Sequence, residues 1–202
     1  MPHRISTAAW FAAVALSYTY DACATPPTKN PAAAAAAGCF AAGDGYLRAR
    51  MRGALLLDLD WKDAQMQCEG GPRPSGNGVR VSIGGPIRGE GRRIRMVFGI
   101  AGVKEGRGGT ALRTNVTVLI EGEKRIFATQ GDDKCTVDSL TQQRVETLGE
   151  DRAIYRVEAH GFCLGPATSL SRDERLYLTS VDFAGRVEFA EDDHHAVDTP
   201  NH

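Results

Sequence analysis

The chain has 202 residues, of which 42% are hydrophobic and 24% charged, and its formal net charge at pH 7 is −1. The hydrophobic fraction is ordinary for a folded protein, and the five cysteines bear on the redox compartment of the protein. Nucleic acid is not expected as a partner, because the aromatic residues do not interleave with the basic ones.

Residues 1–24 have the pattern of a secretory signal peptide. Met1–Arg4 is a short basic opening, and it precedes an apolar run centred on Ala8–Leu16. This run is too short to span a bilayer as a stable helix. The pattern predicts export to the periplasm or beyond the cell, and no transmembrane helix is expected once the signal is cleaved.

The residues around Cys23 fit two ways of ending export. Ala22-Cys23-Ala24 has the small-x-small form of an ordinary cleavage site, which would release a soluble product beginning near Thr25. Alternatively Cys23 is lipidated, as in bacterial lipoproteins; Ala22 fits their motif, but the two residues before it do not. The Pro- and Ala-rich residues 25–38 are typical of a flexible tether, which favours the lipid anchor.

The other four cysteines predict two disulfides. An even number of cysteines in an exported protein indicates a disulfide framework, and three connectivities are possible. We favour Cys39 with Cys68 and Cys135 with Cys163, because neighbouring strands usually come from neighbouring sequence. No Cys-x-x-Cys and no close Cys/His pair offers two ligands from one turn, so neither a metal site nor another cofactor is predicted.

The sequence from Cys39 onward alternates between apolar and polar residues with the period of β-strands. The predicted strands are Tyr46–Arg52, Leu55–Trp61, Ala64–Cys68, Val79–Ile83, Ile94–Ile100, Asn115–Ile120, Arg125–Thr129, Cys135–Ser139, Arg144–Leu148, Ile154–Phe162 and Leu176–Phe189. Breaks are expected at residues 70–78, 84–91 and 102–109, and a hairpin turn at 121–124. About ten short strands predict an all-β fold, an antiparallel β-sandwich or flattened barrel. This single domain would span residues 39–190, followed by a disordered polar tail at 191–202.

Three segments resemble a known group of proteins. They are the strand that carries a cysteine, the run Gly78–Gly85 with its preceding Gly/Asn turn, and the late Gly161-Phe162-Cys163 before a final strand. Together they resemble small exported bacterial β-sandwich proteins of the mycobacterial lipoprotein-antigen kind. The resemblance implies an envelope-associated β-sandwich and brings no catalytic residues with it.

Few residues have a pattern that suggests catalysis. His160 lies in an alternating strand, where a partly exposed structural histidine is the more common case. Asp58 and Asp60 share one strand face and would be either an acid pair or simply the solvated face of that strand. His194-His195 follows two aspartates in the polar tail. No serine has the context of a nucleophile elbow, and no glycine-rich segment has the spacing of a phosphate-binding loop, so no catalytic residue is predicted.

The charges are distributed unevenly along the sequence. Residues 46–114 carry thirteen basic side chains and six acidic ones, whereas residues 115–202 carry nine basic and seventeen acidic ones. Arg48, Arg50 and Arg52 lie on one face of one predicted strand, and they are the predicted binding residues. They would contact an anionic envelope surface or an acidic protein partner. The alternative is that the basic half pairs with the acidic half within the domain.

These patterns favour an exported, non-enzymatic envelope or secreted protein that binds a ligand or a protein partner. The alternatives are a small secreted hydrolase or lyase with dispersed catalytic residues, and an inhibitor of an envelope hydrolase. A concave pocket shared by His160, Asp58 or Asp60 with another titratable group would favour the enzyme.

Overall fold

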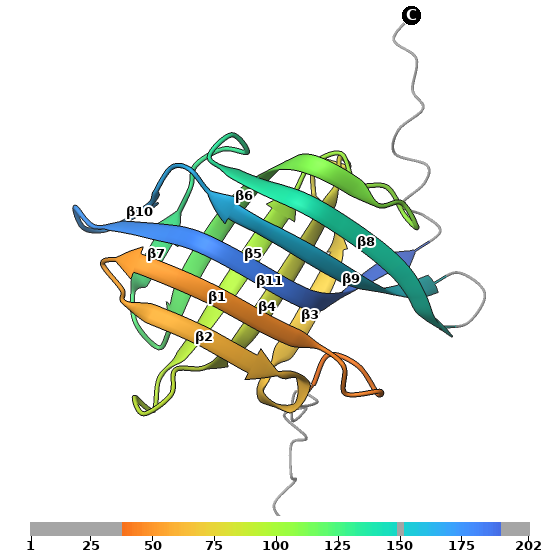
Figure 1. Cartoon of the computed structure of the whole chain (residues 1–202), viewed down its shortest axis with the longest axis horizontal. Helices are drawn as coiled ribbons and strands as arrows, with labels where there is room; N and C mark the ends of the chain where they lie inside the picture. Colours follow the sequence, from red (N-terminus) through yellow and green to blue (C-terminus); the bar gives the residue numbers. More distant parts are fainter. Residues whose placement is uncertain (1–37, 149–151, 191–202) are drawn as a thin grey trace, which may run out of the picture. The chain divides into compact units, whose positions relative to one another are not determined.

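The computed structural model describes residues 38–148 and 152–190, which form eleven antiparallel strands and one short 3-10 helix, η1 (Asp63–Gln65) (Figure 1). The strands are β1 (Tyr46–Gly53), β2 (Leu57–Lys62), β3 (Gln67–Pro72), β4 (Val79–Pro86), β5 (Arg93–Ile100), β6 (Gly109–Glu121), β7 (Arg125–Ala128), β8 (Cys135–Leu148), β9 (Arg152–Cys163), β10 (Ala167–Ser169) and β11 (Arg175–Ala190). The predicted all-β fold is confirmed.

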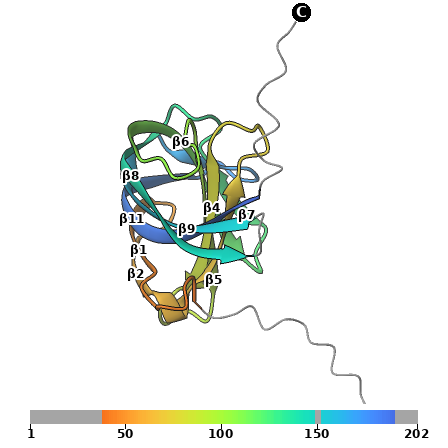
Figure 2. The same ribbon diagram turned by 90° about the vertical axis from the view of Figure 1, so that its right-hand side faces the viewer.

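The strands form one continuous sheet that folds into two packed layers. The front layer has the order β2-β1-β11-β9-β8, and the back layer has the order β3-β4-β5-β6-β7-β10. Strand β6 joins the layers, because residues 109–114 pair with β8 while residues 114–121 pair with β5. Figure 1 shows the strands of the two layers crossing at a steep angle, and Figure 2 shows the layers from the side. This is the orthogonal kind of sheet packing.

The core lies between the layers and follows from the alternation in the sequence. In β4 the side chains of Val79, Val81 and Ile83 are fully buried, and the alternate residue Arg80 is exposed. The rings of Phe98 in the back layer and Phe183 in the front layer stack with centroids 4.8 Å apart. Strands with clear alternation, such as β1 and β6, contribute one face to the core and leave the other more exposed.

Two of the predicted boundaries are wrong near Cys68. Ala64–Cys68 is not one strand, because η1 occupies Asp63–Gln65 and β3 begins only at Gln67. Strand β3 also continues through Gly70 and Gly71, which were predicted to lie in a loop. A Cβ at Gly70 would lie 2.1 Å from the carbonyl oxygen of Arg186, so glycine is needed there because β3 and β11 approach closely.

Three further boundaries differ from the prediction. Strand β4 extends to Pro86, into the predicted break. The two short runs predicted from Cys135 to Leu148 are one strand of 14 residues, β8. The short strand β10 was not predicted at all. The predicted hairpin between residues 120 and 125 is present as β6 and β7.

Both predicted disulfides are present. The bridge Cys39–Cys68 ties the start of the described residues to β3, and the bridge Cys135–Cys163 joins directly opposite residues of β8 and β9. The predicted signal peptide, the residues 25–37 of the tether, Cys23, His194-His195 and the tail 191–202 all lie outside the described residues. Within residues 38–148 and 152–190, no helix has the length and hydrophobicity needed to cross a membrane.

Candidate functional site

The three predicted binding arginines lie together on the outer face of the front layer. Their strand, β1, buries Leu47, Ala49 and Met51 in the core, so the alternate side chains of Arg48, Arg50 and Arg52 point outward. Their side chains are 55%, 62% and 40% exposed. The predicted placement of these arginines is therefore confirmed.

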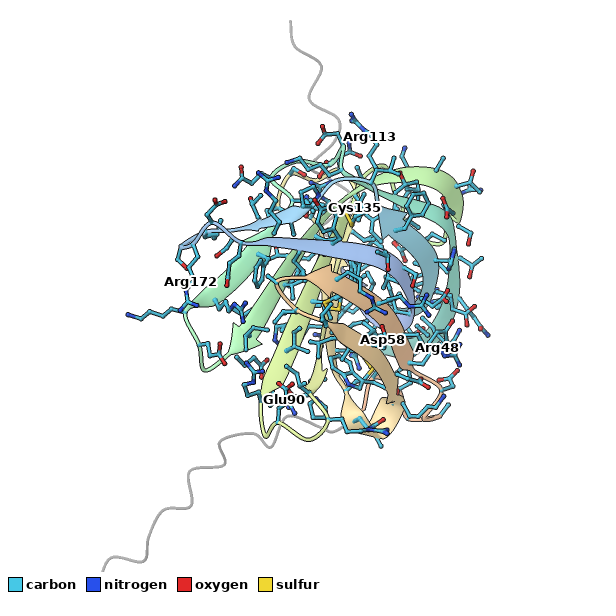
Figure 3. All side chains as sticks on the ribbon, turned by 60° about the vertical axis from the view of Figure 1, so that its left-hand side comes forward. Arg48, Asp58, Glu90, Arg113, Cys135 and Arg172 are labelled. Atoms are coloured by element: carbon cyan, nitrogen blue, oxygen red, sulfur yellow. A yellow bond between two sulfur atoms is a disulfide. The ribbon has the colours of Figure 1, made fainter. Side chains whose placement is uncertain are left out.

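Carboxylates of the neighbouring strand β2 lie beside these arginines. The register places Arg48 opposite Asp60 and Arg50 opposite Asp58. The Arg48 Nε lies 3.6 Å from the Asp60 Oδ1, and the Arg50 Nε lies 3.7 Å from the Asp58 Oδ1. Arg52 donates two hydrogen bonds to the Asp58 carboxylate, at 2.7 and 3.2 Å. Figure 3 labels Arg48 and Asp58 on these two strands.

These ion pairs do not come from the acidic half of the sequence, as the internal-pairing alternative expected. Asp58 and Asp60 belong to the same basic half as the arginines. The hydrogen bond from Arg52, with its positive charge, lowers the pKa of Asp58. Because the pairs are exposed to solvent, each contributes little to stability.

The strip formed by β1 and β2 keeps a surplus of positive charge. Its outer face carries four cations, Arg48, Arg50, Arg52 and Lys62, against the carboxylates of Asp58 and Asp60. We call these six residues the arginine strip. A shallow hollow of about 220 Å³ lies over it, lined also by Ser180 and Asp182 of β11. Guanidinium groups arranged in this way are suited to several carboxylates or phosphates at once.

His160 lies further along the same face, between two carboxylates. Its Nδ1 lies 2.7 Å from the Asp182 Oδ1, across the pair of β9 and β11. Its Nε2 lies 3.9 Å from the Asp138 Oδ2, on β8. Asp138 reaches this position because it is the unpaired residue of a β-bulge between Val137 and Ser139.

The surroundings of His160 form a second shallow hollow, of about 240 Å³. It is lined by Tyr46, Ser139, Thr141, Glu158, Ala159, His160 and Asp182. Burial, and then the charges of Glu158 and Asp182, raise the pKa of Tyr46. Asp182 lines both hollows, so His160 and the arginine strip belong to one continuous polar face. Sequence reasoning missed this juxtaposition, because it depends on the register of β11 with both β1 and β9.

The chemistry available at His160 is limited. An aspartate on Nδ1 would orient the ring for proton transfer through Nε2. However, Nε2 faces another carboxylate, and the hydroxyl of Ser139 makes no hydrogen bond to the ring. Among the described residues, no group of three or more His, Cys, Asp or Glu side chains could hold a metal ion. The exposed arginines and carboxylates of this face can bind polar and charged groups.

Comparison with known proteins finds no family model, curated protein or solved structure that matches this sequence. The resemblance to lipoprotein antigens stays a prediction.

Proposed function

We propose that this protein is an exported, non-enzymatic envelope or secreted protein that binds an anionic partner through the arginine strip. Two disulfides support a compartment that is oxidising, where such bridges form and persist. The basic and apolar opening of the sequence supports export. The protein is either released or anchored through Cys23.

The observation that carries the proposed binding role is the surplus of cations on the arginine strip. Its four cations face the two carboxylates of β2 and, across β1, the carboxylate of Asp182, which lies opposite Arg48, so one cation remains in surplus. All six side chains of the strip are at least 40% exposed. Exposed guanidinium groups keep most of their hydration and remain free to exchange one carboxylate for another. An anionic lipid surface, glycan or protein would add to the existing pairs without breaking the fold.

A triple variant that removes the three positive charges tests this role. Arg48, Arg50 and Arg52 are replaced by glutamine, and retention on vesicles containing anionic lipid and on a sulfated-glycan resin is measured against salt. We expect retention to fall and to lose its salt dependence. The melting temperature should change little, because ion pairs that are this exposed contribute little to stability.

The matched control replaces Arg107, Arg113 and Arg172 by glutamine. All three are exposed, and the change in net charge is the same. Figure 3 shows Arg113 and Arg172 well away from Arg48. Equal loss of retention in the two triple variants would indicate a general charge effect and contradict the proposal. A lower melting temperature with unchanged retention would assign the arginines to internal pairing alone.

The alternative of an exported hydrolase or lyase has one observation in its favour, the contact of His160 with Asp182. This pair lies in an open hollow without a hydrogen-bonded nucleophile, and each side chain is at least 42% exposed. Binding is therefore the better supported role.

A further inference from the structure

Strand β2 is an open edge of the front layer. Among the described residues it pairs with β1 alone, and it ends the strand order of the sheet. An edge strand presents unpaired backbone N–H and C=O groups, which can pair with another extended segment. The hydrogen bonds around β2 determine which of its residues present these groups.

The even-numbered residues of β2 point their backbone groups away from β1. The N–H of Lys62 donates to the side-chain Oε1 of Gln65, at 2.9 Å, so it is not directed at its opposite residue Tyr46. In an antiparallel pair the direction alternates from residue to residue. The N–H and C=O groups of Asp58 and Asp60 are therefore directed at the open edge.

A groove of about 380 Å³ runs along this edge. Its lining includes five consecutive residues of β2, Leu57–Trp61, and on its other side Pro86–Arg88 at the start of the β4–β5 turn. The indole Nε1 of Trp61 donates to the carbonyl oxygen of Pro86 at 2.9 Å and so fixes the two walls together. The groove combines an unpaired strand edge with apolar side chains.

The wall opposite β2 ends in an unpaired cation. Arg88 is exposed, and within residues 38–148 and 152–190 it makes no hydrogen bond or ion pair. This differs from Arg92 and Arg93 at the other end of the same turn, which contact Glu123 and Glu121. A carboxylate on a bound segment would satisfy Arg88.

We propose that the groove binds an extended peptide segment of about five residues, which adds to β2 as a further strand and places a carboxylate against Arg88. This is recognition by β-strand addition, in which backbone hydrogen bonds give affinity and side-chain contacts give selectivity. The carboxylate belongs either to an acidic side chain or to the C-terminus of the bound peptide. The inference uses the backbone groups of Asp58 and Asp60, whereas the proposed role of the arginine strip uses their side chains and those of the neighbouring arginines.

A second copy of this protein is a poorer occupant of the groove. Antiparallel pairing of β2 with itself about a two-fold axis at Asp60 would place that carboxylate opposite its own copy, and like charges directly opposite are destabilising. Pro86–Arg88 also line the groove on the side away from β2, so there is room beside β2 for one strand more readily than for a whole second sheet. A single extended segment meets neither obstacle.

Three acetylated pentapeptides that alternate valine and threonine serve as probes. One ends in a free carboxylate, one in an amide, and one in an amide with glutamate as its last residue. Each is titrated into the full-length protein and followed by the amide NMR signals of Asp58, Asp60 and Arg88. We expect saturable changes at these signals. One of the two peptides that carry a carboxylate should bind about two- to five-fold more tightly than the amide peptide without one.

Two variants test the backbone and the cation separately. Asp60→Pro removes one outward N–H and should weaken all three peptides by about five-fold or more. Its control, Asp60→Ala, removes the same carboxylate but keeps the N–H, so weaker binding by Asp60→Pro than by Asp60→Ala reports the loss of the backbone N–H alone. Arg88→Gln should erase only the preference for carboxylate peptides, whereas Arg107→Gln should leave it unchanged.

Peptides with methylated backbone nitrogens provide a test that leaves the protein unaltered, and they should not bind. The inference is overturned if methylated peptides or Asp60→Pro bind normally, or if no probe changes the β2 signals at millimolar concentration. If the protein forms a dimer without peptide, and Asp60→Pro dissociates that dimer, the groove binds a second copy and the inference is overturned.

Discussion

Asp63 shows how one buried acid can organise a segment that has no regular structure. Its side chain is almost fully buried, and its Oδ1 accepts hydrogen bonds from the backbone N–H groups of Cys39, Phe40 and Gly45, at 3.0, 3.2 and 3.0 Å. These bonds fold residues 39–45 against η1 beside the first disulfide. Buried amide groups without such an acceptor are costly, so Asp63 is a structural residue.

Replacing Asp63 by alanine should lower the free energy of unfolding by about 2 to 4 kcal/mol, because three amide N–H groups lose their acceptor. Asp63→Asn keeps an oxygen at the same position and should recover part of this loss. Urea unfolding of the two variants and the parent measures the difference. Equal stability of the alanine variant and the parent would show that the loop finds other acceptors at no cost.

The strands show what could be predicted from the sequence and what could not. Strands with one buried and one solvated face, such as β1 and β5, were found because alternation records burial directly. Strand β8 was split in two because Gln142 occupies an inward position. Its side-chain Nε2 donates to the carbonyl oxygens of Lys104 and Arg107, a partnership with a distant loop that no local pattern reveals.

In the candidate site, too, contacts within one hairpin could be predicted from the sequence, and contacts between distant strands could not. The outward direction of Arg48 and its neighbours follows from period two within one strand, and their pairing with Asp58 and Asp60 is a contact within one hairpin. The contact of His160 with Asp182 depends on strands whose paired residues are 22 positions apart, and on a bulge at Asp138. Register over such separations is set by tertiary packing.

Two loops that are distant in sequence are joined by a partly buried ion pair that predicts a pH dependence. Arg73, after β3, donates two hydrogen bonds to the carboxylate of Asp132, between β7 and β8, at 2.9 and 3.1 Å. Asn115 also donates to it, at 2.6 Å. The hydrogen bond from Arg73 lowers the pKa of Asp132, and Asn115 adds to this effect against the opposing effect of burial.

Folding lowers the pKa of Asp132. The ion pair therefore stabilises the protein at pH values above the pKa of an aspartate in the unfolded state, about 3.9. This stabilisation is lost as the pH falls through the pKa of Asp132 in the folded state. Asp132→Asn should cost about 1 to 2 kcal/mol at pH 7, and the cost should shrink below about pH 4. Urea unfolding across pH 3–7 measures it. Asp173→Asn, at an exposed loop residue, is the control, and a cost at Asp132 that is constant down to pH 3 would contradict the assignment.

The whole domain is held together by strands that belong to both layers. Strand β11 pairs with β1, β9 and β10, and β6 pairs with β5, β7 and β8, so the pairing closes a circuit through both layers. Ion pairs that join the basic and acidic halves of the sequence, such as Arg93 with Glu121, cross between neighbouring strands of the back layer. The internal-pairing alternative is therefore correct for this layer, although not for the arginine strip.

The two disulfides act on this domain mainly through the unfolded state. Their cysteines are separated by 29 and 28 residues, so each bridge removes a similar loop-closure entropy from the unfolded state. The Cys135–Cys163 bridge joins strands that are already paired in register. The Cys39–Cys68 bridge attaches a segment that contacts β3 through an isolated bridge and η1 through the hydrogen bonds to Asp63. The local structures differ, but loop closure alone predicts equal effects.

Replacing either pair of cysteines by serine should therefore lower the free energy of unfolding by about 3 to 4 kcal/mol, and protein made in a reducing cytoplasm should lose the sum of both. Chemical unfolding of the oxidised parent, the two double variants and the reduced parent compares these values. A much larger loss for Cys39→Ser with Cys68→Ser would show that this bridge also holds residues 38–45 in the native state. No loss for either pair would contradict the entropic account.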